Sequence, residues 1–403
     1  MTPRVLSIPA GAPFLPTLAD ALLSGTLVPG FSHDGDPLKL AEATIYVPTR
    51  RAARALRGVF VDRLGGVSAI LPSIRPLGEF DEDAALFEGA GGDALALAPA
   101  IGGLERILLL APLVHKWKQR LPAHVASLFG EDVVVPASLA DAVWLSRDLA
   151  SLMDEVETGG ADWARLASLV PDDLASWWQV TLEFLEIVTG AWPALLAERD
   201  RSNPAAHRNA AILAEAERLS RDPPQGPVVA AGSTGSIPAT ARLLAVIARL
   251  PGGAVVLPGL DRDMDAASWA AIASHDATAA GFGHPQAGLK KLLAVLGVPR
   301  DAVEALCAPQ PALAVRARLV AEALRPAETT DLWASRAGPV DPAALDGVTL
   351  IEAANEREEA FAIAVALRLA LAQGTAALVT GDRELARRVA AELRRFGIEA
   401  DDS

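Results

Sequence analysis

The sequence is poor in cysteine, with Cys307 as its single one in 403 residues. One cysteine excludes a disulfide within the chain, and it excludes a zinc or iron–sulfur site built from cysteines of this chain alone. The six histidines form no HExxH motif and no pair spaced by four residues, so a histidine-based metal site is not indicated either. A chain without disulfides fits a reducing compartment, and we expect a cytoplasmic protein.

A long uncharged apolar run is also missing. The longest apolar window, residues 101–114, contains Glu105 and Arg106 and is too short to cross a bilayer. At the N-terminus, prolines interrupt the apolar residues before a signal-peptide core can form. We therefore expect a soluble protein with no membrane partner.

Positive charge is scarce, with 36 Lys and Arg against 50 Asp and Glu and a net charge of −14. This balance excludes a protein that coats nucleic acid by bulk charge, so any such contact must be a local basic patch. The composition, 51% hydrophobic and 21% charged, is that of a globular protein. At this length, roughly two to four domains are expected.

The most informative stretch that is present runs from Val228 to Asp261. A short apolar run, a Gly/Ser/Thr loop, a helical pattern beginning near Pro238 and a second apolar run predict a βαβ unit. Because neither strand alternates in polarity, both should be buried in a parallel sheet covered by helices. Ligands of such sheets bind at the carboxyl ends of the strands, here residues 232–236 and 258–263.

The N-terminal region predicts further strand–loop–helix steps of the same sheet. Residues 4–11 read as a strand, followed by a helix over 15–23, and the loop between them is where a phosphate cradle would lie. A P-loop needs several glycines, a Lys and a Ser or Thr, whereas this loop has only Gly11 between prolines that lack an N–H. A strand over 43–48, a helix over 49–66 ending at a glycine pair, and an extended segment over 68–80 follow.

Five arginines fall within the helix predicted over 49–66. Arg50, Arg54 and Arg57 are spaced i, i+4 and i+7 and therefore share one face. Such a face is either solvated or binds phosphates, and the sequence pattern alone leaves both interpretations open.

The remainder divides by pattern into four regions. Residues 83–222 predict a helical insertion, and most of its tryptophans lie at apolar helical positions typical of a core. Residues 223–330 return to the sheet domain, with helices over 285–298, 301–307 and 311–325, so that 1–82 and 223–330 form one domain. Residues 331–347 read as a linker. Residues 348–403 predict a new α/β unit with strands over 348–353, 376–380 and 398–403, and we expect this unit to be truncated.

Two loops carry residues that could bind an anion or a metal ion. The loop after the first strand of the βαβ unit would hold an anion, or would serve as a tight turn with Ser236 as helix N-cap. Asp261 would hold a metal, or would belong to an ordinary acidic loop. The carboxylates of residues 154–157 are expected to be solvated. These are the candidate nucleotide-site positions: Gly11, Gly232, Ser233, Thr234, Gly235, Ser236 and Asp261.

Several stretches together resemble the B subunit of the bacterial AddAB helicase–nuclease family, which acts in double-strand-break repair. The stretches are IYVPTRRAARALR, ILPSIRPLGEFDED, DEVE, WWQVTLEFLEIVTGAWP, AAGSTGSIPATARLLAVIARLPGGAVVLPGLD and LIEAANEREEAFAIAVALRLAL. The resemblance implies an α/β fold of the UvrD-type helicase core, with two RecA-like domains that carry helical insertions, the second incomplete here. It places TRRAARALR at a motif that touches single-stranded DNA, which makes Thr49, Arg50, Arg51, Arg54 and Arg57 the candidate DNA-binding residues.

The chain departs from this family at the nucleotide site. It lacks the GKT of a Walker A loop, and Ala231 and Gly232 stand where a helicase has Asp-Glu. The resemblance then implies a motor-inactive body that guides DNA for an ATP-hydrolysing A-type subunit, with no ATP or magnesium of its own. The family's nuclease domain and iron–sulfur cluster would lie beyond this chain. Two alternatives stay open: an ATPase or phosphotransferase using the GSTGS loop, and a structural scaffold for a partner subunit.

Overall fold

The computed structural model describes residues 2–77, 97–120, 138–163, 165, 181–182, 184–273, 279–335 and 340–401. The chain forms two compact units, residues 1–340 and 341–403. The boundary between them lies inside the segment predicted as a linker. Among the described residues, no helix has the length and hydropathy needed to cross a bilayer.

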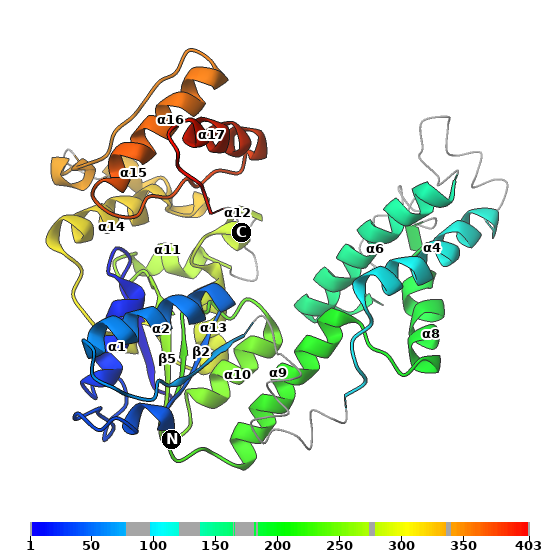
Figure 1. Ribbon diagram of the computed structural model, residues 1–403, viewed down its shortest axis with the longest axis horizontal. Helices are drawn as coiled ribbons and strands as arrows, with labels where there is room; N and C mark the ends of the chain where they lie inside the picture. Colours follow the sequence, from blue (N-terminus) through cyan, green and yellow to red (C-terminus); the bar gives the residue numbers. More distant parts are fainter. Residues whose placement is uncertain are drawn as a thin grey trace. The chain divides into compact units, whose positions relative to one another are not determined.

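The centre of the first unit is a parallel β-sheet (Figure 1). Its described strands are β1 (Val5–Ile8), β2 (Thr44–Val47), β3 (Ser73–Pro76), β4 (Val228–Ala231), β5 (Gly253–Pro258) and β6 (Glu304–Ala305). They lie in the order β3-β2-β4-β5-β1-β6, with Thr44 opposite Val228 and Val5 opposite Val255. The parallel α/β class and the βαβ unit predicted from the sequence are confirmed.

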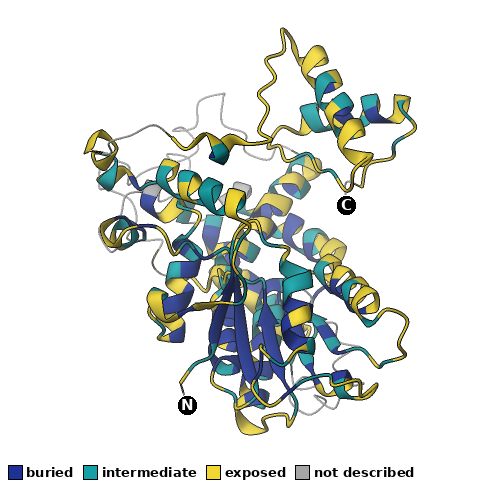
Figure 2. Ribbon diagram, turned by 90° about the vertical axis from the view of Figure 1, so that its left-hand side faces the viewer, coloured by how far each residue is buried: buried dark blue, intermediate teal, exposed yellow. Residues whose placement is uncertain are grey.

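Helices cover both faces of the sheet because side chains alternate along each strand. Leu6 and Ile45 face one core, shared with α1 (Phe14–Leu23) and α2 (Arg50–Leu64). Tyr46 and Val255 face the opposite core, which α9 (Pro204–Arg221), α10 (Pro238–Ile247) and α13 (Ala287–Leu296) complete. Figure 2 shows the strands as the most deeply buried part of this unit. Burial on both faces explains the unbroken apolar runs in the sequence.

The connections bring two loops together at the carboxyl edge of the sheet. From β2 the chain passes to α2 on one face, and from the neighbouring β4 it passes to α10 on the other. Where the loops after two adjacent strands lead to opposite faces of the sheet, a crevice forms between the loops, and α/β proteins bind ligands in this crevice. The strand order also differs from the 3-2-1-4-5-6 order of dinucleotide-binding sheets.

A group of helices lies between β3 and β4 in the sequence. It comprises α4 (Gly103–Arg120), α6 (Leu139–Gly159), a π-helical turn η5 (Ile187–Ala191) and α8 (Trp192–Glu198). Helix α6 begins with a capping box between Ser138 and Asp141 and ends at Gly160 in the left-handed conformation. The N-terminal half of α9 packs against α6, while its C-terminal half packs on the sheet, so this helix joins the two parts (Figure 1).

Most of the tryptophans described in this group are core residues, as predicted. Trp192 is fully buried, and Trp117 packs edge-on against Phe184 at 4.9 Å between ring centroids. Trp144 is an exception, because 65% of it is exposed. Trp177 and Trp178 lie outside the described residues.

One helix predicted in this unit is wrong. Residues 301–307 form the end of a 3₁₀ turn, η6 (Arg300–Ala302), and then β6. Leu306 N donates to Ser7 O at 2.8 Å, so pairing with β1 overrides the helical pattern of a short segment. The helix predicted next is α14 (Pro311–Ala323). The other short helices described in this unit are η1 (Lys39–Glu42), α11 (Ala266–Ala271), α12 (Ala279–Gly283), η7 (Ala327–Thr329) and α15 (Leu332–Ser335), while η8 (Pro342–Leu345) belongs to the second unit.

The second unit contains two packed helices, α16 (Glu356–Leu371) and α17 (Arg383–Arg395). Ala360 and Ala364 of α16 meet Val389 and Leu393 of α17. The strands predicted over 348–353 and 376–380 are wrong: both segments are described, and neither forms a strand. The strand predicted over 398–403 is wrong in its described part, residues 398–401, and residues 402–403 lie outside the described residues. A parallel strand needs a neighbour for its N–H and C=O groups, and these two segments pair with none in the described part of the unit.

Candidate nucleic-acid interface

Helix α2 begins at the carboxyl edge of the sheet, directly after β2. Thr49 is its N-cap, and its hydroxyl accepts a hydrogen bond from Ala52 N at 3.1 Å. At the other end Gly65 takes the left-handed conformation, as the glycine pair predicted. The first turn of α2 is therefore fixed next to the loops where ligands of parallel sheets bind.

The arginines of α2 face solvent. Ala53, Leu56 and Phe60 are buried against the sheet, and this apolar stripe holds the arginine face outward. The exposed residues at the start of the helix are Thr49, Arg50, Arg51, Arg54 and Arg57.

The arginines differ in how far they are engaged. Arg57 Nη2 donates to Ile74 O at 3.4 Å, and Arg63 Nε pairs with Asp20 Oδ1 at 2.7 Å. Arg54 has no hydrogen-bond or ion-pair partner within the described residues. Among the exposed arginines of α2, Arg54 is thus the one whose guanidinium is best placed to bind an external anion.

The loop from β4 to α10 is a tight turn. Gly232 and Gly235 have φ of +81° and +62°, and Ser233 Oγ accepts a hydrogen bond from Gly235 N at 3.2 Å. The helix begins at Pro238 as predicted, but its N-cap is Ile237 and not Ser236, so that prediction is wrong. Proline fixes its own φ and disfavours helical backbone in the residue before it, which sets the boundary there.

Protein side chains occupy the space beside these glycines. A Cβ on Gly235 would lie 2.7 Å from Leu292 Cδ1 of α13, and one on Gly232 would lie 3.4 Å from Phe14 of α1. The glycines therefore permit the close approach of neighbouring apolar side chains. Thr234 and Ser236, between and after them, are exposed.

The loop after β1 is likewise filled. Gly11 has φ of +82°, and a Cβ there would lie 3.2 Å from the side chain of Leu313 in α14. Helix α1 starts after Pro13, which supplies no N–H and no side-chain cap. Apolar atoms thus stand where a phosphate cradle would present N–H groups.

Asp261 caps a turn after β5. Its Oδ1 accepts hydrogen bonds from Asp263 N and Met264 N, both at 2.9 Å. Its backbone N donates to Gln286 Oε1 at 3.1 Å. Asp261 Oδ1 is therefore used within the loop, which is the role of an ordinary turn aspartate.

The predicted site residues lie at one edge of the sheet, in four loops. The loops after β2 and β4 form a first neighbouring pair, and the loops after β1 and β5 form a second. Gly232 lies beside Pro48, which precedes Thr49, and Gly259, close to Asp261, lies beside Ala10, which precedes Gly11. The α2 arginines belong to the first pair. Among the described residues, no group of three or more His, Cys, Asp and Glu is arranged to hold a metal ion.

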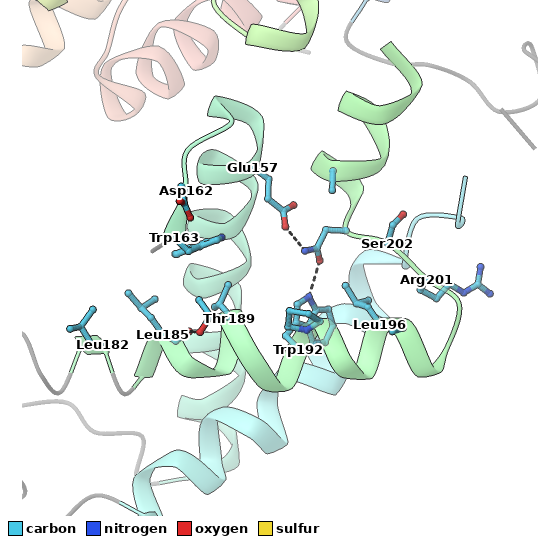
Figure 3. Close-up of a pocket in the computed structure, with 15 residues that line it drawn as sticks. Glu157, Asp162, Trp163, Leu182, Leu185, Thr189, Trp192, Leu196, Arg201 and Ser202 are labelled. Atoms are coloured by element: carbon cyan, nitrogen blue, oxygen red, sulfur yellow. Dashed lines mark hydrogen bonds between the residues drawn. The ribbon is translucent and has the colours of Figure 1, made fainter. Parts of the chain in front are cut away.

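A separate cavity of about 820 Å³ lies within the helical group (Figure 3). Its walls are mainly apolar, with Leu185 and Leu196 among them. On its polar side, Trp192 Nε1 donates to Asn203 Oδ1 at 2.9 Å, and Asn203 Nδ2 donates to Glu157 Oε1 at 2.5 Å. Trp192, Asn203 and Glu157 Oε1 thus form a chain of hydrogen bonds, while Glu157 Oε2 has no hydrogen-bond partner among the described residues.

Sequence reasoning missed the partly or fully buried carboxylates. In residues 154–157, predicted as solvated, Asp154 pairs with Arg106 at 2.8 Å and Glu157 is half-buried. Glu215 of α9 is buried and binds Arg218 at 2.7 Å and the hydroxyl of Tyr46. A single tyrosine in the chain, placed in a buried strand, was the one available signal that a polar partner was needed.

A scan against models of protein families finds no match for this chain, and a search of curated proteins finds none either.

Proposed function

We propose that this chain is the helicase-like, motor-inactive part of an AddB-type subunit, and that it guides a DNA strand in recombinational double-strand-break repair. An A-type partner subunit would hydrolyse ATP, and a nuclease outside this chain would cut. The motif resemblance, the parallel α/β sheet and the exposed arginines of α2 support this proposal.

The observation that carries the proposal is the exposed arginine row at the start of α2. Arg50, Arg51 and Arg54 lie around a helix N-terminus, whose partial positive charge also favours anions. Guanidinium groups bind phosphate oxygens in a bidentate manner. In a chain of net charge −14, such a row provides the local basic patch that binding a nucleic-acid strand requires.

The loops of the sheet edge support a body without a motor of its own. The side chain of Leu313 packs on Gly11, and Leu292 packs on Gly235, where a nucleotide-hydrolysing site would hold phosphates. Asp261 uses a carboxylate oxygen in its own turn. These contacts weigh against the alternative of an ATPase or phosphotransferase built on the GSTGS loop.

Arg54→Gln tests the proposal, with Arg63→Gln as its matched control on the same helix. We expect Arg54→Gln to weaken binding of a single-stranded oligonucleotide and to reduce the slope of log K against log salt by about 0.7, the value for one phosphate contact. Arg63→Gln should leave the slope unchanged, because Asp20 already pairs with that guanidinium. The measurement is fluorescence anisotropy across a salt titration.

The triple variant Arg50→Gln, Arg51→Gln and Arg54→Gln should reduce the slope by up to about 2. Equal slopes for wild type, Arg54→Gln and the triple variant would remove DNA binding from this helix. Circular dichroism confirms that the variants keep their fold.

A further inference from the structure

Helix α17 of the second unit carries a second arginine row. Five of its 13 residues are arginine, although residues 341–403 carry more acidic than basic side chains overall. Arg383, Arg387 and Arg394 are spaced i, i+4 and i+11, so at 3.6 residues per turn they fall within about 40° of one another. We refer to these three residues as the α17 row.

The row lies on the side of α17 away from the second unit's core. Val389 and Leu393 are buried against α16, whereas the three arginines of the row are exposed. Ala390 and Ala391 fill the positions between Arg387 and Arg394, so no carboxylate interrupts the row there. At 1.5 Å per residue the row is about 16 Å long, which suits a chain of anionic groups better than a single anion.

The row is only weakly engaged within the protein. Arg387 pairs with Glu384 at 2.8 Å, with 72% and 62% of the two side chains exposed, and such solvated pairs are weak. Arg383 and Arg394 have no hydrogen-bond or ion-pair partner in the described part of the chain. The other two arginines of the helix, Arg388 and Arg395, pair with Glu356 and Glu392 and lie beside the row.

The start of α17 repeats the start of α2. In α2, Thr49 is the N-cap and Arg50 and Arg54 follow at the first and fifth helical positions. In α17, Asp382 is the N-cap and Arg383 and Arg387 follow at the same positions. Both helices bury an apolar stripe and turn their arginines to solvent. The two units thus present the same local arrangement.

We propose that the α17 row is a second phosphate-binding surface for single-stranded nucleic acid. The inference rests on the proposed function for its choice of ligand, and on the α17 geometry for its site. A linear set of guanidinium groups matches the repeating phosphates of a strand, and arginine binds phosphate bidentately. The second unit then has a phosphate-binding surface of its own.

The test compares two double variants that remove the same charge from the same helix. We expect Arg383→Gln with Arg394→Gln to weaken binding of a single-stranded oligonucleotide and to lower the salt slope by about 1.4, for two contacts. The matched pair, Arg388→Gln with Arg395→Gln, removes arginines that lie outside the row and have acidic partners, and it should lower the slope less. Both are made in the full chain, and circular dichroism checks their fold.

Each outcome decides the inference. Equal losses in the two double variants would show an effect of net charge alone and overturn it, as would no loss in either. Polyglutamate that competes as well as the oligonucleotide, charge for charge, would overturn the preference for phosphate. If the α2 variants bind normally while the α17 pair is impaired, the role of α2 fails and the α17 surface stands.

Discussion

At the scale of single residues, Glu157 shows how burial sets the behaviour of a carboxyl group. Burial raises the pKa of Glu157, while hydrogen bonding from Asn203 and the nearby charge of Arg106 oppose that shift without cancelling it. Its Oε2 has no hydrogen-bond partner among the described residues. A raised pKa means that the folded protein disfavours the ionised form, so this group lowers stability as the pH rises above about 4.3, the ordinary value.

We therefore expect Glu157→Gln to stabilise the protein at pH 7. The amide oxygen can still accept the hydrogen bond from Asn203, and the charge is gone. The gain should shrink towards about pH 3, where the wild-type carboxyl is mostly protonated in both states. Urea unfolding at the two pH values measures it.

Glu155→Gln is the control, because Glu155 is exposed on the same helix and its replacement should change the free energy of unfolding by less than about 0.5 kcal/mol. A loss of stability in Glu157→Gln at pH 7 would contradict this account.

At the scale of elements, α9 joins the helical group to the sheet. At one end, Asn209 Nδ2 donates to Glu157 O at 2.8 Å, which ties α9 to α6. Further along, Glu215 accepts hydrogen bonds from Tyr46 of β2 and from Arg218. Burial raises the pKa of Glu215, but the hydrogen bonds from Arg218 and Tyr46 outweigh burial and hold this pKa below its ordinary value. Its contribution to stability is therefore present above about pH 4.3 and is lost on acidification through the lowered pKa.

Glu215→Ala should destabilise the protein by about 3–5 kcal/mol, because it leaves a buried hydroxyl and a partly buried guanidinium without their acceptor. Tyr46→Phe removes one donor and should cost about 1 kcal/mol. The exposed pair Arg63–Asp20 is the control: Arg63→Gln should cost at most about 1 kcal/mol. Urea unfolding followed by tryptophan fluorescence gives the three values. A cost for Glu215→Ala no larger than that for Arg63→Gln would show that the packing of α9 on the sheet does not depend on the hydrogen bonds of Glu215.

At the scale of the whole molecule, the two units bury their apolar residues to different extents. Strands β1, β4 and β5 of the first unit are buried on both faces. In the second, the segments before α16 and α17 leave Leu350 85% and Val379 94% exposed. Exposed apolar side chains of this kind add little to folded stability and favour association.

The double variant Leu350→Ser with Val379→Ser should accordingly change the free energy of unfolding by no more than about 1 kcal/mol, at about 0.5 kcal/mol for each surface site. It should also bind less of a hydrophobic dye than the wild type. Leu293→Ser, in the core of the first unit, is the contrasting change and should destabilise strongly. A large loss of stability in the double variant would mean that these side chains are covered in solution.

The sequence by itself determined the parallel sheet, the helical group and the position of the arginine row. Continuous apolar runs identify strands buried on both faces, and the spacing of the arginines in α2 identifies their shared face of that helix. These signals depend only on residues close together in the sequence, so they can be identified before the fold is known. They also placed Gly232 and Asp261 at the same edge of the sheet, because the strands of a parallel sheet all run the same way.

Only the tertiary structure decided what each loop contacts. Whether Gly11 faces a ligand or Leu313, whether Glu157 is solvated, and whether residues 304–305 join the sheet all depend on segments far away in the chain. The same holds for the segments before α16 and α17, whose apolar pattern is that of strands but which have no paired neighbour in the described unit. A local pattern fixes which face of a helix or strand is apolar. Strand pairing and burial depend instead on the distant segments that the fold places against that face.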